Sequence, residues 1–304
     1  MPTRSAELAR VLDRVVPGRA RADELLARHT SFRIGGPADV LVMPETAAEL
    51  GGILGAAATA GVTVTLLGGG SNMLVGDAGI RGVVVKLGRG FRRILWDEPS
   101  VEAGAAVQLG GLARDAVDRG LAGLEHAEGI PGTVGGALCM NAGAYGGEMA
   151  DAVDAVEGVD AAGAVRRLAR SSLAFVYRRA VLPAGFVVTA VRFRLRPEAT
   201  EAVRTRLDAA RTRRTTSQPH GWANAGSIFK NPNGDYAGRL VEAVGLKGTR
   251  VGGARISERH GNFIVNEGDA RAADVQALMQ QAQRVVWEER GVWLEPEVRL
   301  VGSW

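Results

Sequence analysis

The sequence contains a single cysteine and no apolar segment long enough to cross a membrane. Cys139 stands alone among 304 residues, so an intramolecular disulfide is excluded and nothing indicates an oxidising compartment. A transmembrane helix needs about 20 consecutive apolar residues. The N-terminal residues also lack the apolar core of a signal peptide. We therefore expect a cytoplasmic protein that does not insert into a membrane.

Several common catalytic signatures are also missing. No glycine-rich segment continues into Gly-Lys-Ser/Thr or matches Gly-x-Gly-x-x-Gly at the start of a helix, which argues against a P-loop and a standard dinucleotide fold. No Gly-x-Ser-x-Gly nucleophile elbow occurs. The four histidines show no metal-ligand spacing, so we expect no metal site.

The chain is mildly basic, with a formal net charge of +4. Its densest basic cluster lies between Arg204 and Arg214, and this pattern is typical of a solvated helix face. No basic patch with interleaved aromatic residues appears, so we expect no nucleic-acid partner. A mildly basic protein would suit a small anionic substrate.

The most informative feature that is present is a pair of glycine-rich runs, Gly68–Val75 and Gly129–Gly147. A glycine lets another body approach the backbone closely, and exposed backbone N–H groups bind phosphates well. Ser71 and Asn72 could add side-chain donors to a pyrophosphate site. Either run alone could be only a tight turn. Together, each beside an apolar β-rich segment, they favour a large cofactor held mostly by backbone.

The hydrophobic pattern predicts a mixture of helices and strands. A β-α-β-loop-β order is expected over residues 39–87, in which Thr46 begins the helix as its N-cap and residues 62–67 form a buried strand. Later elements expected are helices at 108–119, 198–216, 236–244 and from Asp269 to Gly291, and strands at 153–159, 187–195, 262–266 and 297–301. We divide the chain into residues 1–95, 96–200, 201–294 and 295–304.

A few polar residues stand out as candidates for chemistry. The segment Ala225–Pro232 holds Ser227 and Lys230, while Arg178 and Glu297 lie elsewhere in the chain. Each has an ordinary alternative as a turn cap, a surface cation or an exposed strand residue. His126 is interpreted as structural, and the carboxylates Asp97, Glu98, Glu125 and Glu128 as solvated.

Eight segments in a fixed order carry a resemblance to a known family. They are Thr30–Gly36, Leu67–Val75, Gly129–Ala137, Asn141–Gly146, Tyr177–Arg178, Gly226–Pro232, His260–Asn266 and Glu297–Arg299. In this order the chain resembles the UDP-N-acetylenolpyruvoylglucosamine reductases, flavoenzymes of peptidoglycan precursor synthesis. The interval between Arg178 and Gly226 is short and has no tyrosine, as in the family's shorter form. The resemblance therefore leaves open which groups hold the substrate diphosphate.

The resemblance implies an α+β protein, with a two-part FAD-binding domain of the PCMH type shared with certain oxidases and a C-terminal α+β domain that binds the UDP-sugar. It implies non-covalent FAD. The expected cofactor-binding residues in the first run are Gly68, Gly69, Gly70, Ser71, Asn72, Met73 and Leu74. Those in the second are Gly129, Ile130, Pro131, Gly132, Thr133, Gly135, Gly136, Ala137, Asn141, Gly143 and Ala144.

The resemblance also implies the reaction. NADPH reduces FAD, and the flavin hydride then adds to C3 of UDP-N-acetylglucosamine enolpyruvate to give UDP-N-acetylmuramate. Ser227 is expected to protonate C2, while Arg178 and a protonated Glu297 stabilise the enolate. Substrate contacts are expected from Tyr177, Lys230 and Asn231. We expect a monomer.

Two other interpretations remain open. An FAD-dependent oxidase of the same fold often anchors its flavin covalently, and Cys139 would be the only cysteine for that bond. A non-catalytic nucleotide-sugar-binding protein would bind the same ligands without turnover. The joint presence of Arg178, Ser227 and Glu297 argues against the second.

Overall fold

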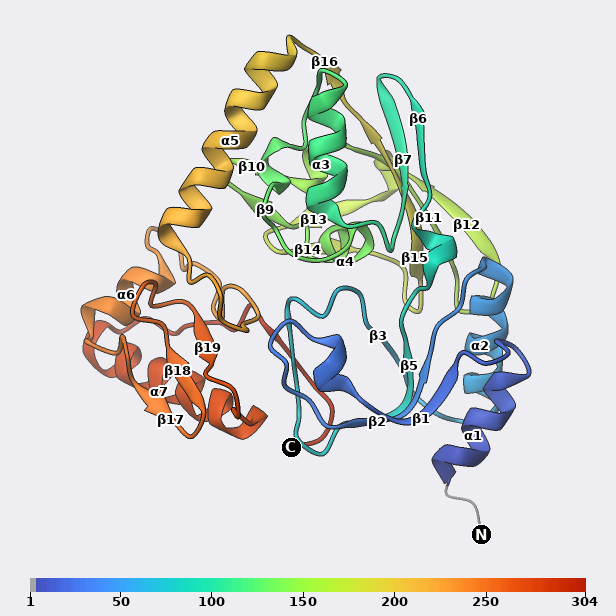
Figure 1. Cartoon of the computed structure of the whole chain (residues 1–304), viewed down its shortest axis with the longest axis horizontal. Helices are drawn as coiled ribbons and strands as arrows, with labels where there is room; N and C mark the ends of the chain where they lie inside the picture. The colour runs from blue at the N-terminus through green and yellow to red at the C-terminus, as the bar shows by residue number, and fades with distance from the viewer. Residues whose placement is uncertain (1–3) are drawn as a thin grey trace. The chain divides into compact units, whose positions relative to one another are not determined.

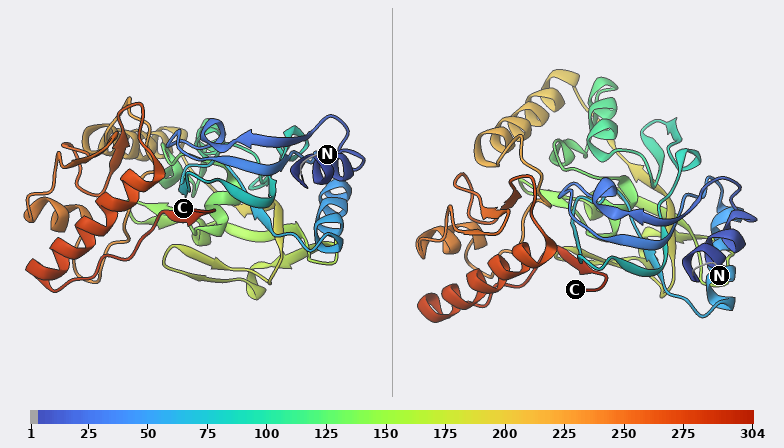
Figure 2. Two further views of the ribbon diagram at one scale, coloured as in Figure 1. Left: turned by 90° about the horizontal axis from the view of Figure 1, so that it is seen from below. Right: turned by 60° about the horizontal axis from the view of Figure 1, so that its bottom comes forward.

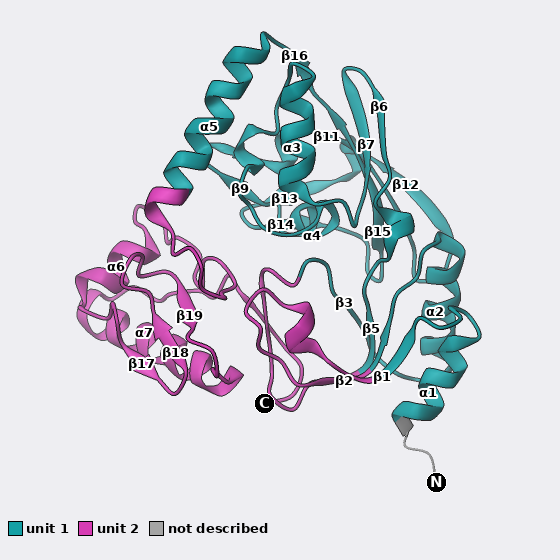
Figure 3. Ribbon diagram, viewed as in Figure 1, with its two compact units in different colours: residues 1–22, 40–69, 82–214 teal, residues 23–39, 70–81, 215–304 magenta. Residues whose placement is uncertain are grey.

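A computed structural model describes residues 4–304, which fall into two compact units (Figure 3). Of the described residues, unit 1 comprises 4–22, 40–69 and 82–214, and unit 2 comprises 23–39, 70–81 and 215–304. Each unit combines segments that are distant in sequence. The consecutive four-part division expected from the sequence stays a prediction. Both units contain helices and strands, which confirms the predicted α+β class.

The first sheet has the strand order β1–β2–β5–β3 (Figure 1). Its strands are β1 (Ala20–Leu25), β2 (Pro37–Val42), β5 (Ile80–Val85) and β3 (Val64–Leu66). Strands β2 and β5 confirm two predicted strands. The prediction that residues 62–67 form a buried strand is wrong about burial: β3 lies at the sheet edge, and Leu66 is 42% exposed.

Two helices of unit 1 lie side by side in all views (Figures 1 and 2): α1 (Arg4–Asp13) and α2 (Ala47–Thr59). Leu12 of α1 and Leu50 of α2 are fully buried in one core with Val40 of β2. The predicted N-cap is confirmed, because the Thr46 hydroxyl accepts a hydrogen bond of 3.1 Å from the backbone N of Glu49.

The second sheet of unit 1 is antiparallel, with the order β12–β11–β15–β7–β6. Its strands are β12 (Val165–Ala169), β11 (Val153–Val159), β15 (Val187–Arg194), β7 (Ser100–Gly104) and β6 (Ile94–Asp97). Helices α3 (Leu109–Asp118) and α4 (Val134–Cys139) belong to the same core. Helix α3 buries Leu109, Leu112 and Ala116 on one face, and it ends before Gly120, whose φ is 67°.

Short elements of unit 1 connect these layers. The paired strands are β8 (Leu121–Ala122) with β16 (Arg196–Pro197), β9 (Gly143–Ala144) with β10 (Gly147–Glu148), and β13 (Ala174–Val176) with β14 (Arg179–Val181). The 3₁₀ turns are η2 (Arg89–Phe91), η3 (Glu125–Ala127), η4 (Met149–Asp151) and η5 (Arg170–Ser172). Helix α5 (Thr200–Ser217) confirms the predicted polar helix, and its residues up to Arg214 belong to unit 1.

Unit 2 is built on a three-stranded sheet in the order β17–β18–β19, with helices α6 and α7 in the same core. These elements are α6 (Ala237–Ala243), β17 (Arg250–Val251), β18 (Ala254–Ile256), β19 (Ile264–Asn266) and α7 (Ala272–Arg290). The unit also contains η1 (Leu26–His29) and the parallel pair β4 (Met73–Val75) and β20 (Arg299–Val301).

The beginning of α7 differs from the prediction. Asp269 does not cap this helix, since its first residue is Ala272. Two carboxylates cap it instead: Asp77 accepts hydrogen bonds from the backbone N of Ala272 (2.8 Å) and of Ala273 (3.1 Å), and Asp274 accepts one of 2.9 Å from the backbone N of Arg271. The end is as predicted, at Gly291 with a φ of 66°. Throughout residues 4–304, no helix combines the length and apolar character needed to cross a membrane.

Candidate functional site

The two glycine-rich runs meet inside unit 1. A Cβ built on Gly69 would lie 2.7 Å from the Cα of Gly132, and one built on Gly68 would lie 3.1 Å from the Thr133 hydroxyl oxygen. Larger side chains at Gly69 would force the two backbones apart, so glycine is required for this approach. The structure thus brings together two segments that the sequence assigns to one cofactor.

The second run begins with two glycines of positive φ and continues into a short helix. Gly129 and Gly132 have φ values of 72° and 113°, which favour glycine. The Thr133 hydroxyl caps α4 by accepting a hydrogen bond of 3.4 Å from the backbone N of Gly136. The remaining predicted cofactor residues here are Ile130, Pro131, Gly135 and Ala137, in the same loop and helix.

A buried carboxylate supports the start of this run. Glu128 is only 4% exposed, which corrects the expectation that it is solvated. Its side chain forms ion pairs of 3.0 Å with Arg114 of α3 and with Arg211 of α5. Arg214 packs against the next residue, since a Cβ on Gly129 would lie 2.6 Å from its Cδ. Three arginines from two helices therefore lie at the entry to the glycine run.

Asn141 ends the helical part of the run with a φ of 42°. Its side-chain amide donates a hydrogen bond of 3.2 Å to Val176 O and accepts one of 3.0 Å from the backbone N of Ala150. These bonds to backbone give the amide a structural role. The predicted residues Gly143 and Ala144 form β9, which pairs with β10.

Arg178 lies on the two-residue turn between β13 and β14, which the sequence did not predict. Its φ of 60° is unfavourable for an arginine, and such strain is common at functional sites. One guanidinium nitrogen donates a hydrogen bond of 2.9 Å to Gly143 O, and the group lies 5.0 Å from the ring of Tyr177. The turn therefore holds a cation beside the second glycine run.

The first run continues into unit 2, which contains the predicted residues Gly70, Ser71, Asn72, Met73 and Leu74. Ser31 N donates a hydrogen bond of 3.0 Å to Gly70 O. The Asn72 side chain donates one of 3.1 Å to Glu297 O, and Asn72 O accepts one of 3.0 Å from the backbone N of Arg299. Met73 and Leu74 belong to β4. These bonds join the run to the C-terminal segment of the chain.

Ser227 and Glu297 lie on neighbouring backbone segments of unit 2. Ile228 O accepts a hydrogen bond of 2.8 Å from Glu297 N, and Lys230 N donates one of 2.8 Å to Glu295 O. Both Ser227 and Glu297 are half-buried. A predicted proton donor and a predicted enolate-stabilising carboxyl are therefore brought together by backbone pairing.

Asn262 is a residue whose importance the sequence interpretation missed. It is 3% exposed, and its amide makes two hydrogen bonds of 2.8 Å to the backbone N and O of Phe229. The sequence feature that could have identified it is its position in the family segment His260–Asn266. The amide keeps the strand-like segment that follows Ser227 in position.

The predicted substrate residues Lys230 and Asn231 both have partners within unit 2. The Lys230 ammonium forms an ion pair of 2.5 Å with Glu295. The Asn231 side-chain oxygen accepts a hydrogen bond of 3.1 Å from the backbone N of Ala237 at the start of α6. Of the three predicted catalytic residues, unit 2 holds Ser227 and Glu297, and unit 1 holds Arg178.

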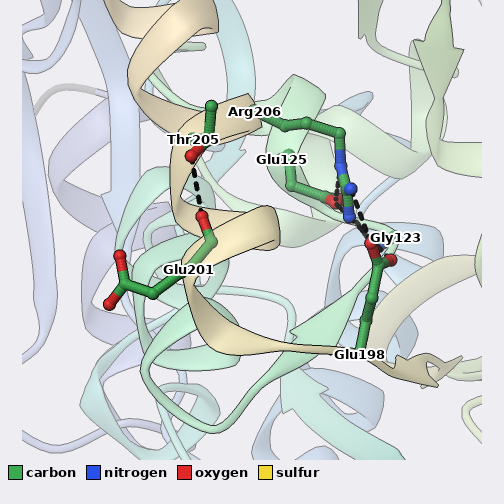
Figure 4. A network of polar contacts seen from close by, with 6 residues as sticks. All are labelled: Gly123, Glu125, Glu198, Glu201, Thr205 and Arg206. Atoms are coloured by element: carbon green, nitrogen blue, oxygen red, sulfur yellow. Dashed lines mark hydrogen bonds and ion pairs between the residues drawn. The ribbon is translucent and has the colours of Figure 1, made fainter.

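The basic cluster of α5 is not a simple solvated face. Arg206 binds Glu125 and Glu198 at 2.8 and 2.7 Å, and these two carboxylates raise its pKa (Figure 4). Arg214 is half-buried, and burial lowers its pKa. The charge of nearby Arg178 acts in the same direction. Helix α5 therefore presents arginines to the second glycine run, which the sequence interpretation did not anticipate.

Two family models match separate parts of the chain. Residues 38–169 match an FAD binding domain. Residues 218–301 match the C-terminal domain of UDP-N-acetylenolpyruvoylglucosamine reductase. These matches confirm the predicted cofactor, FAD, and the predicted combination of an FAD-binding domain with a C-terminal domain. The second glycine run lies within the first match, and Ser227 and Glu297 lie within the second.

Curated relatives cover almost the whole chain. The UDP-N-acetylenolpyruvoylglucosamine reductase of Moorella thermoacetica is 45% identical over 92% of this chain and 93% of the relative. A reductase of the same name from Symbiobacterium thermophilum, numbered 2, is 47% identical over 94% of this chain and 93% of the relative.

A solved structure from the same family has a similar fold. The crystal structure of the UDP-N-acetylenolpyruvylglucosamine reductase (MurB) from Thermus caldophilus has a TM-score of 0.82 and 41% identity, covering 92% of this chain and 99% of that one. Identity at this level over nearly full length exceeds what a shared fold alone requires. The chain belongs to the UDP-N-acetylenolpyruvoylglucosamine reductase family, whose members are oxidoreductases acting on a carbon–carbon double bond.

Proposed function

We propose that this protein reduces UDP-N-acetylglucosamine enolpyruvate to UDP-N-acetylmuramate with NADPH as reductant, as a step in peptidoglycan precursor synthesis. The observation that carries the proposal is the pairing of Ile228 with Glu297, which sets a serine and a carboxyl on adjacent segments of the matched C-terminal domain. The cytoplasmic setting and the monomeric state remain predictions from the sequence.

The residues present fit FAD. Gly68 and Gly69 pack directly against Gly132 and Thr133, so the two runs together form one backbone surface with few side chains. Such a surface admits a pyrophosphate or a flat ring to backbone N–H groups. We assign FAD binding to the residues of both runs named above. When bound, the flavin supplies the hydride for C3 of the enolpyruvyl group.

Ser227 is proposed to give the proton to C2. Its hydroxyl is a weak acid, but the developing carbanion is strongly basic, so a positioned hydroxyl suffices. The preceding residue supports this position: Gly226 has a φ of 73°, and its N donates a hydrogen bond of 2.9 Å to the Asn224 side chain. Asn262 fixes the residues on the other side.

Arg178 and Glu297 are proposed to stabilise the negative charge that develops on the substrate. The guanidinium of Arg178 binds a carboxylate through charge-assisted hydrogen bonds. A protonated Glu297 donates a hydrogen bond to the enolate oxygen. Preorganised donors of this kind stabilise a transition state because they need no reorientation as charge appears. The bond from Arg178 to Gly143 O gives that preorganisation.

The remaining predicted substrate residues surround these groups in their own units. Tyr177 is 50% exposed beside Arg178, so its ring is available to a ligand. Lys230 is proposed to bind a substrate phosphate or amide, and doing so requires it to leave Glu295. The Asn231 side-chain oxygen already caps α6, which leaves its NH₂ group for a substrate.

An anaerobic half-reaction experiment tests the proposal. The visible spectrum of the purified holoenzyme is recorded, NADPH is added, and UDP-N-acetylglucosamine enolpyruvate follows. We expect bleaching of the flavin bands and then their recovery on addition of the substrate. Recovery with oxygen alone would instead indicate an oxidase, and bound ligand without any spectral change would indicate a non-catalytic binding protein.

The variant Ser227→Ala separates the two halves of the reaction. Flavin reduction by NADPH is expected to stay close to that of the unchanged protein, because the hydroxyl acts on the second substrate. Substrate reduction is expected to slow about 10²- to 10⁴-fold, the usual range for a positioned acid. An equal loss in both half-reactions would refute the role of Ser227 as proton donor.

A further inference from the structure

A buried hydroxyl in the second sheet of unit 1 forms no hydrogen bond within residues 4–304. It belongs to Thr189 of β15, which is 4% exposed. The other buried residues of β15 are all apolar: Val187, Val188, Val191 and Phe193. A buried hydroxyl without a partner destabilises the fold, so such groups are rare in folded proteins and are found where a ligand completes the hydrogen bonding.

Thr189 is the extra residue of a β-bulge. Its neighbours Val188 and Ala190 lie opposite two consecutive residues of β11, Gly158 and Glu157. Thr189 itself therefore has no partner residue on that strand. Bulges redirect side chains and are common beside functional sites.

The bulge directs the Thr189 side chain to the face of the sheet that packs on α4. Val188 and Val191 are three positions apart and would lie on opposite faces of a regular strand. Both nevertheless belong to the core that contains residues of α3 and α4. Thr189 lies two positions before Val191 and shares its face. The unpartnered hydroxyl is thus on the side of the helix that belongs to the second glycine run.

Backbone hydrogen bonds connect Thr189 to this glycine run. Thr189 O accepts one of 2.8 Å from Ala105 N, and Ala105 O accepts one of 3.0 Å from Gly135 N. The approach is close, since a Cβ on Gly135 would lie 2.7 Å from the Cβ of Ala105. Thr189 is therefore two hydrogen bonds away from a residue assigned above to FAD binding.

We propose that the Thr189 hydroxyl is a further contact of this chain with FAD, to which it forms one hydrogen bond. A threonine hydroxyl can both donate and accept, and FAD carries polar atoms of both kinds along its length. The β-bulge then has a function, because it adds a hydroxyl to a face of β15 that is otherwise apolar. The inference rests on FAD binding, for which the matched domain stands, and not on the proposed reaction.

The test removes the hydroxyl and measures the affinity of the holoenzyme for FAD. Thr189→Val replaces the hydroxyl by a methyl group and keeps the branched shape, and Thr189→Ala differs from Thr189→Ser by the hydroxyl alone. Thr205→Val is the matched control, because Thr205 is exposed on α5 and its hydroxyl donates to Glu201 O at 2.8 Å (Figure 4). Each holoenzyme is diluted, and the free FAD is measured in an ultrafiltrate.

We expect the Kd of FAD to rise about three- to tenfold in Thr189→Val, as for the loss of one hydrogen bond. Thr189→Ala should exceed Thr189→Ser by a similar factor, and this pair decides the question where the valine variant yields no folded protein. Thr205→Val should change the Kd by less than about twofold. A hydroxyl without a ligand predicts the reverse, because valine would remove an unpaired polar group from an apolar core. An unchanged Kd in either comparison at position 189 would overturn the proposal.

The visible spectra of the same holoenzymes locate the contact. A shift of the flavin absorption bands in Thr189→Val, absent from Thr205→Val, would support a hydrogen bond to the flavin ring. Unshifted bands together with a raised Kd would support a hydrogen bond to the remainder of FAD. Neither measurement uses NADPH or the UDP-sugar, so failure of the half-reaction experiment would refute the proposed function and leave this inference standing.

Discussion

Replacement of Glu128 by glutamine tests whether the buried ion-pair cluster supports the FAD-binding run. The carboxylate is 5% exposed at its side chain and binds two arginines at 3.0 Å, whereas Arg114 and Arg211 are 50% and 48% exposed. Glutamine keeps the shape and one acceptor but removes the charge. The glutamine NH₂ group is a donor and would face the N–H donor of one arginine, so this buried NH₂ group would have no hydrogen-bond acceptor there.

The magnitude follows from these exposures. A charge-assisted hydrogen bond contributes about 1.5 to 3 kcal/mol, and breaking a buried pair costs about 3 to 5 kcal/mol. The half-exposed arginines can hydrate after the change, so the lower part of the range applies. We expect the free energy of unfolding to fall by about 1.5 to 3 kcal/mol. When about 1.4 kcal/mol of this loss comes from reduced order of the glycine run at Gly129, the Kd of FAD rises about tenfold.

Urea unfolding and FAD titration of the apoprotein measure the two effects. The control is Glu98→Gln, since Glu98 pairs with Arg119 at the same distance of 3.0 Å but is 51% exposed. An exposed pair contributes about 0 to 1 kcal/mol. The reasoning would be refuted if Glu128→Gln matched Glu98→Gln in both measurements. The double variant Glu128→Gln/Arg211→Gln is expected to lose less than the sum of its single variants, because the two side chains interact directly.

Three further predictions follow from the contacts. Gly69→Val is expected to yield protein with little bound flavin, because its Cβ would lie 2.7 Å from Gly132 Cα and would push the two runs apart. The ratio of flavin absorbance to protein absorbance should then be close to that of the apoprotein, and full flavin content would contradict the contact. Asp77→Ala removes one of the two carboxylates that cap α7, because Asp274 remains. It should lower the free energy of unfolding in urea by about 0.5 to 2 kcal/mol, whereas Asp208→Ala, at an exposed position, should change it by less than about 0.5 kcal/mol. Burial lowers the pKa of His126 below its ordinary 6.5, so near that pH the unfolded chain binds a proton that the folded chain does not. The stability that is present above pH 6.5 is therefore lost as the pH falls through and below 6.5. His126→Asn should make the dependence of the free energy of unfolding on pH shallower, and an unchanged dependence would exclude this histidine as its source.

The sequence alone was sufficient for the local features of this protein. Thr46, Gly120 and Gly291 mark helix ends, because capping and positive φ are properties of single residues and their neighbours. The two glycine runs were also evident, since a backbone that must approach another body needs glycine wherever it occurs. The ordered family segments added the cofactor class, which the matched FAD binding domain confirms.

Other features depended on contacts between distant residues. The turn that holds Arg178 joins strands of three residues each and lacks an Asn-Gly signal, so its local pattern was too weak to predict. The cap of α7 was assigned to Asp269, whereas the carboxylate that accepts from Ala272 N is Asp77, 195 residues away. A carboxylate from elsewhere in the chain leaves no trace in the sequence beside the helix.

Burial and pairing of charges were likewise decided by tertiary structure. Glu128 resembles other acidic residues in the sequence, yet α3 and α5 enclose it with two arginines. The pairing of Ile228 with Glu297 joins segments about 70 residues apart, a separation at which no sequence periodicity operates. Local sequence determines which backbone conformations and helix ends are available; which side chains lose solvent, and which catalytic candidates become neighbours, depends on how those elements pack.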